Sequence, residues 1–90
     1  TVDVADIYSS DPAIGVKDLV ILSDPRMLIL PQNVTPLVSA SLPAIAATAI
    51  NRVSVLLTPG ELRALNHRST GEKLSSKVIA ADWLASKKLL

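Results

Sequence analysis

Short apolar runs separated by turn-forming residues make up the first third of the chain. Apolar and polar residues alternate in part over residues 2–8, which favours a short extended segment. A Ser-Ser-Asp-Pro cluster, typical of a turn, follows at residues 9–12. Residues 19–22 form a continuous apolar run between Asp and Ser, which is typical of a strand buried on both faces. Residues 33–39 predict another strand, and Pro36 puts it at a sheet edge or beside a bulge.

From residue 42 onward the pattern becomes helical. Apolar residues recur at helical spacing from Leu42 to Leu57, and Pro43 suits the first helical position. Thr58 is a good cap for the next helix, because Pro59 follows it and the side chain of Glu61 can reach back to complete a capping box.

A third helix is expected at the C-terminal end of the sequence. Ser75 or Ser76 starts it, and its inner face carries Val78 or Ile79 together with Trp83. We interpret Trp83 as a core residue, since a large aromatic at helical spacing is usually packing. The sequence therefore predicts an α/β fold, with short strands in the first third and then three helices.

Composition narrows the class of protein. The chain has 90 residues, of which 49% are hydrophobic, and a formal net charge of +1. These values exclude a disordered tail and argue against a nucleic-acid-binding module. The apolar content is high for so short a chain, so part of the apolar surface is expected to face further sequence or a partner. Because the sequence begins at Thr1, we expect it to be the C-terminal portion of a longer protein.

A membrane span is the first alternative to a globular fold. Residues 27–51 carry no charge and are long enough to cross a bilayer. Pro31, Pro36 and Pro43 interrupt this stretch, and each removes a backbone hydrogen bond that lipid cannot replace. We therefore do not expect a transmembrane helix.

No catalytic or metal-binding pattern is present. Cysteine is absent, and His67 is the only histidine, at the end of an expected surface helix. One histidine without a positioned partner makes no acid–base site, so we interpret it as a solvated residue. The glycines do not form a phosphate loop, and the aspartates lack calcium-loop spacing. We expect no enzymatic activity, no cofactor and no metal.

Two segments are unusual for a purely structural domain. Residues 8–12 put an aromatic ring, hydroxyls and a carboxylate at the end of a predicted strand, where open α/β sheets bind ligands. The alternative is a plain turn with Tyr8 as a core residue. Residues 30–36 hold Gln32 and Asn33 in a rigid extended loop between two prolines. The alternative there is a simple crossover loop.

Five stretches of the chain match one family pattern in the same order: Tyr8-Ser9-Ser10-Asp11, residues 19–26 (LVILSDPR), residues 31–38 (PQNVTPLV), residues 57–66 (LTPGELRALN) and residues 79–84 (IAADWL). On these stretches the chain resembles the C-terminal part of substrate-binding proteins of osmoprotectant ABC importers, of the glycine betaine, carnitine and choline type. The resemblance covers nearly the whole chain.

The resemblance implies a fragment of a two-lobed, type II periplasmic-binding-protein-like fold. Residues 1–32 would supply second-lobe strands and the crossover, and residues 33–90 the return strand and closing helices of the first lobe. The implied function is extracytoplasmic capture of a small osmolyte and its delivery to an ABC permease. The membrane would be reached only through a lipid anchor outside these residues.

The resemblance also implies a ligand site. Tyr8 would be one wall of an aromatic cage, whose ring faces stabilise a methylated cation by about 0.5–2 kcal/mol each. Gln32 stands where the family has a second tyrosine, and its amide can hydrogen-bond a polar ligand group. Ser9, Ser10 and Asn33 would hold a carboxylate or hydroxyl, or position the loop. The central expectation is that Tyr8 and Gln32 form two sides of one pocket.

An alternative function is a structural or interaction module that self-associates through its apolar face. The isolated 90 residues are expected to form a homodimer, because the sheet edges would lack their normal neighbours.

Overall fold

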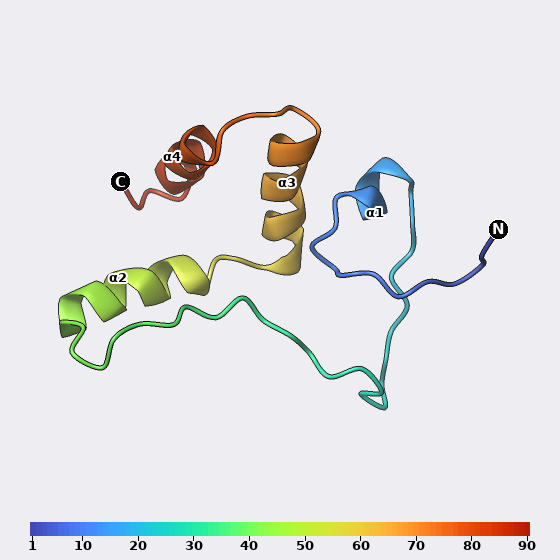
Figure 1. Ribbon diagram of the computed structural model, residues 1–90, viewed down its shortest axis with the longest axis horizontal. Helices are drawn as coiled ribbons and strands as arrows, with labels where there is room; N and C mark the ends of the chain where they lie inside the picture. Colours follow the sequence, from blue (N-terminus) through green and yellow to red (C-terminus); the bar gives the residue numbers. More distant parts are fainter. The chain divides into compact units, whose positions relative to one another are not determined.

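The computed structural model describes residues 1–90 and contains four helices and no β-strand (Figure 1). The helices are α1 (Ala13–Val16), α2 (Ala44–Ser54), α3 (Pro59–Thr70) and α4 (Ser76–Ser86). The chain divides into two compact units. The first unit comprises Thr1–Ile21 and Thr58–Leu90, and the second unit comprises Leu22–Leu57.

The expected α/β fold with short strands in the first third is wrong. Residues 2–8, 19–22 and 33–39 form no strand. A strand exists only where its N–H and C=O groups pair with a neighbouring strand, and no segment of this chain pairs in that way. The apolar run at residues 19–22 shows the consequence, because its side chains stay 45–83% exposed. A suitable hydrophobic pattern is therefore not sufficient to make a strand.

Helix α1 was not indicated by the hydrophobic pattern, since four residues are too few to show a helical period. It starts from a side-chain contact, in which the Asp11 Oδ1 atom accepts a hydrogen bond from the Ala13 N–H at 2.8 Å. Ile14, within the helix, is 8% exposed. The Leu19 N–H then donates to the Ile14 carbonyl at 2.8 Å, so the chain turns back directly after the helix.

Helix α2 lies in the second unit and confirms a helix within the apolar repeat of residues 42–57, over Ala44–Ser54. Pro43 was predicted at the first helical position, but it is the N-cap residue, one position before the helix begins at Ala44. It caps the helix with an extended ψ of 143°, and its carbonyl accepts from the Ala46 and Ala47 N–H groups. No residue of the second unit is buried. None of the four helices combines the length and apolar character needed to cross a bilayer.

Helix α3 begins as the sequence predicts. The Thr58 Oγ1 atom accepts from the Glu61 N–H at 3.3 Å, and Pro59 occupies the first turn. The capping box is not completed by the Glu61 side chain, which instead bonds to α4. A glutamate three residues after the cap can bond to another part of the fold instead of to the cap residue. Here the Glu61 carboxylate accepts a hydrogen bond from the indole of the buried Trp83.

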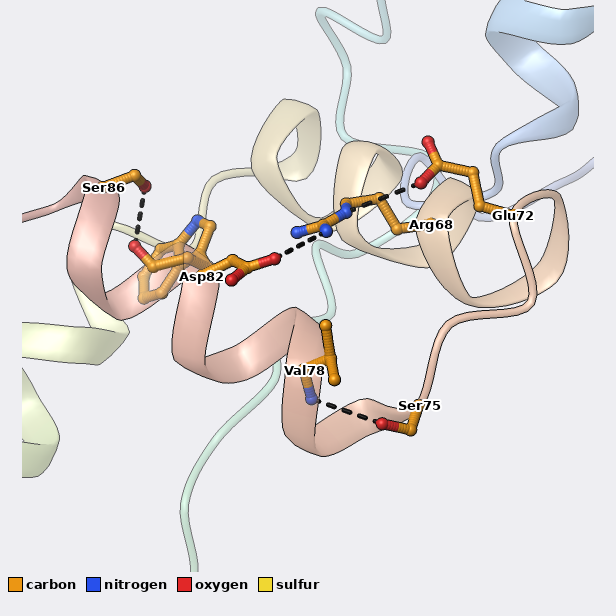
Figure 2. Close-up of polar contacts among 7 residues, drawn as sticks. Arg68, Glu72, Ser75, Val78, Asp82 and Ser86 are labelled. Atoms are coloured by element: carbon orange, nitrogen blue, oxygen red, sulfur yellow. Dashed lines mark hydrogen bonds and ion pairs between the residues drawn. The ribbon is translucent and has the colours of Figure 1, made fainter.

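Helix α4 is capped by Ser75, whose Oγ atom accepts from the Val78 N–H at 3.4 Å (Figure 2). The structure decides which residues face inward. Ile79 is 6% exposed and Trp83 is 8% exposed, whereas Val78 is 45% exposed. The interpretation of Trp83 as a core residue is confirmed.

Polar side chains join α3 to α4. The Trp83 Nε1–H donates to the Glu61 Oε2 atom at 2.8 Å, and the Lys87 ammonium donates to the other oxygen of the same carboxylate. Farther along α3, the Arg68 Nη2 atom donates to the Asp82 Oδ2 atom at 2.8 Å (Figure 2). These contacts fix the α3–α4 pair beside its small apolar core.

Replacing Trp83 by Ala should be the most damaging single change in this pair. Truncating a buried aromatic costs about 3–5 kcal/mol of unfolding free energy. Val78→Ala, on the exposed side of the same helix, should cost less than about 0.5 kcal/mol. Chemical denaturation followed by helical circular dichroism compares the two variants. Equal losses would contradict the assignment of the inner face.

Candidate functional site

Residues 8–12 form a compact turn, called here the Tyr8 turn, at the entry to α1. The Asp11 N–H donates to the Tyr8 carbonyl at 3.0 Å, which closes the turn. The Ile14 N–H then donates to the Asp11 carbonyl at 3.2 Å and leads the chain into α1. The residues that the sequence singled out therefore lie in an ordered turn.

Two side chains of α3 hold this turn from outside. The Arg63 Nη1 atom donates to the Ser9 carbonyl at 2.6 Å, and the Asn66 Nδ2 atom donates to the Ser10 carbonyl at 3.0 Å. The Arg63 bond is charge-assisted, and such bonds are about twice as strong as neutral ones. Sequence reasoning missed both residues. Their spacing of three on a helix, which puts them on one face, was the available signal.

The Tyr8 side chain is 73% exposed, so the alternative that it is a core residue is wrong. Tyr8 is one of the residues that line an open groove of about 720 Å³ within the first unit, together with Asp11, Asn66, His67 and Thr70. An exposed ring on a hydrogen-bonded turn can offer a face to a cation without first rearranging the backbone.

The two serines contribute to this turn through their backbone. Ser9 is exposed and Ser10 is partly exposed, and in both residues α3 contacts the carbonyl oxygen. Their hydroxyl groups make no hydrogen bond within the chain. The expectation that Ser9 and Ser10 hold a ligand group stays a prediction.

Gln32 and Asn33 lie in the second unit, where both are exposed. They belong to a segment without regular structure, in which the Asn33 carbonyl accepts from the Thr35 Oγ1 atom at 3.3 Å. Tyr8 belongs to the first unit, and each unit is described by itself. The expectation that Tyr8 and Gln32 share one pocket therefore stays a prediction.

A tight turn precedes that segment in the second unit. The Met27 N–H donates to the Asp24 carbonyl at 3.1 Å, and the Ile29 N–H donates to the Asp24 Oδ2 atom at 2.9 Å. The backbone hydrogen bond from Ile29 is the main reason that the pKa of Asp24 is lowered, because N–H donors stabilise the ionised carboxylate.

The ion pairs of the first unit include no residue of the Tyr8 turn. The hydrogen bond from Lys87, followed by that from Trp83, lowers the pKa of Glu61 below its ordinary value. The Lys87 Nζ atom also lies 5.8 Å from the centre of the Trp83 ring. No group of three or more His, Cys, Asp or Glu side chains is placed to hold a metal ion.

The comparison with protein families defines the class of this protein as the substrate-binding component of an ABC importer. The family model for the substrate binding domain of the ABC-type glycine betaine transport system matches residues 1–86. The chain belongs to this family, and the resemblance inferred from its five stretches is confirmed. Comparisons with curated proteins and with solved structures gave no match.

Family membership establishes several general properties. The family consists of transport proteins and is not an enzyme family. It implies a small-molecule substrate and an ABC permease as partner. Substrate-binding domains of ABC importers act outside the cytoplasm.

Acid should weaken the α3–α4 contact through Glu61. Because its pKa is lowered in the folded state, Glu61 stabilises the fold above the unfolded-state pKa, and this stabilisation is lost as the pH falls through the folded-state pKa. Glu61→Gln should lower the melting temperature at neutral pH. It should also reduce the fall in melting temperature that acid causes in the wild type, here called the acid limb. Glu72→Gln, the matched change at the only other glutamate, should leave that limb intact. Melting curves between neutral and acidic pH measure both variants, and parallel acid limbs for wild type and Glu61→Gln would refute this role.

Proposed function

We propose that the protein carrying these residues captures a quaternary ammonium solute such as glycine betaine outside the cytoplasm and delivers it to an ABC permease, without catalysing a reaction. The observation that carries the proposal is the exposed Tyr8 ring on a turn held by α3, in a chain that belongs to the glycine betaine family.

The chemistry of the solute explains why a ring is suitable. A trimethylated ammonium group has no N–H with which to donate a hydrogen bond, so carbonyls and carboxylates cannot bind it as they bind lysine. The face of an aromatic ring attracts the cation through the ring quadrupole, by about 0.5–2 kcal/mol depending on desolvation. Tyr8 is the only tyrosine of the chain, and Trp83 is already buried.

The remaining predicted site residues are assigned to the polar end of the solute. Gln32 would donate its amide N–H to the solute carboxylate, in the position where the family has a second tyrosine. Asn33, Ser9 and Ser10 would assist it. In this proposal the solute is bound between two lobes, with residues 1–32 in one lobe and residues 33–90 in the other.

Removing the Tyr8 ring should weaken solute binding. Tyr8→Ala is expected to raise the Kd for glycine betaine by about 2- to 30-fold, and Tyr8→Phe should retain most of the affinity because it keeps the ring face. Isothermal titration calorimetry of the protein that carries these residues measures both changes. Val4→Ala, an exposed apolar residue of the same segment, serves as the control.

The ligand provides a second control. The tert-butylacetate anion has the shape of glycine betaine but a carbon in place of the ammonium nitrogen, so it should bind far more weakly. Equal affinity for both ligands would reject cation recognition by the ring. If none of glycine betaine, carnitine and choline binds detectably, the proposed function itself is rejected.

A second candidate function is self-association, which the exposed side chains of residues 27–30 favour. These four apolar residues are 58–88% exposed in the second unit. Burying them against a second copy would remove this area from water. Sedimentation equilibrium of the 90-residue chain should then show a dimer that Leu28→Glu and Leu30→Glu convert to a monomer. A monomeric wild-type chain would eliminate this candidate.

A further inference from the structure

Helix α3 carries polar residues on two opposite faces. At about 100° per residue, Glu61 and Arg68 lie within about 20° of each other on the helix surface. Arg63 and Asn66 lie about 60° apart on the other side. The first pair bonds to α4, and the second pair bonds to the Tyr8 turn. Different residues of α3 therefore contact α4 and the Tyr8 turn.

The second pair completes the hydrogen bonding of the turn. Three consecutive carbonyls follow the Tyr8 side chain along the chain, and each has a donor: the Tyr8 carbonyl accepts from the Asp11 N–H, the Ser9 carbonyl from Arg63, and the Ser10 carbonyl from Asn66. Only the first of these bonds is local. The other two come from residues 54 and 56 positions away in sequence.

We infer that Arg63 and Asn66 are positioning residues for solute binding, which hold the Tyr8 turn in the conformation that presents the ring. The inference rests on the proposed role of Tyr8. It adds two residues that act on the ring through the backbone of Ser9 and Ser10. Fixing these carbonyls before binding removes ordering that the solute would otherwise have to impose.

The geometry favours positioning over direct contact. The Arg63 Nη1 atom is engaged by the Ser9 carbonyl at 2.6 Å, and the Asn66 Nδ2 atom by the Ser10 carbonyl at 3.0 Å. Arg63 has no acceptor for the hydroxyl proton of choline, and its positive charge repels the quaternary ammonium ion. A loss of affinity on removing Arg63 is therefore opposite in sign to the direct effect of its charge on the cation.

A double-mutant cycle tests this inference. Arg63→Ala and Asn66→Asp, which is isosteric but lacks the donor, are each made in the wild type and in Tyr8→Ala. In the wild type each should raise the Kd for choline by about 2- to 10-fold, the range for one net hydrogen bond. In Tyr8→Ala each should have little effect, because there is no ring left to position. Arg63→Lys should restore part of the affinity.

Choline is the appropriate probe because it has no carboxylate. Both substitutions make the site more negative, so electrostatics alone would strengthen binding of this cation. Arg52→Ala and Asn51→Asp make the same changes of charge at exposed positions of α2 and should leave the Kd unchanged. Equal losses in the wild-type and Tyr8→Ala backgrounds would overturn the inference and leave the proposed function standing.

A measurement without solute tests the positioning role of Arg63 and Asn66 separately from the proposed solute binding. Fluorotyrosine incorporation gives a Tyr8 resonance, assigned by its loss in Tyr8→Phe. Arg63→Ala and Asn66→Asp should shift or broaden this resonance, while the α2 controls should not. An unchanged resonance in both variants would overturn the inference even if choline binds. If Arg63→Ala fails to fold by circular dichroism, Arg63→Lys and Asn66→Asp still decide the outcome.

Discussion

The first unit depends on helix α3 being bonded from both sides. Glu61 accepts from the indole of Trp83 and from Lys87, and Arg68 donates to Asp82, so that α4 is held on one face. Arg63 and Asn66 hold the Tyr8 turn on the other. The apolar contribution is small, since only Ile14, Ile79 and Trp83 are buried in the whole chain. Directional polar contacts therefore set how α3 is oriented toward α4 and toward the Tyr8 turn.

The polar contacts of the first unit are compatible with the proposed binding of a solute. Catalysis needs reactive groups with matched pKa values, whereas binding of a methylated cation needs ring faces in a fixed orientation. The pKa of Glu61 is lowered by a structural contact with α4, away from the Tyr8 turn. The groups that hold the turn are the Arg63 guanidinium and the Asn66 amide. Family membership places the chain among transport proteins.

The candidate site was predictable in part. The sequence indicated the Tyr8 turn because an aromatic residue, two serines, an aspartate and a proline occur together. It did not indicate Arg63 and Asn66, because their partners are backbone carbonyls more than 50 positions away. Every residue has a backbone carbonyl, so the sequence does not show which carbonyl will be the partner. The same limit applies to Glu61, which the capping pattern assigned to Thr58 and which bonds to Trp83 instead.

Local chemistry explains what the sequence by itself determined. Thr58 with Pro59 starts α3, Ser75 starts α4, and Trp83 lies in the core, because a cap and a helical repeat act over a few residues. Only the tertiary structure decided whether residues 19–22 formed a strand, since an apolar run becomes a strand only when another segment supplies its hydrogen bonds. It also decided that Ile79 and not Val78 faces inward, because the position of α3 selects which side of α4 is covered.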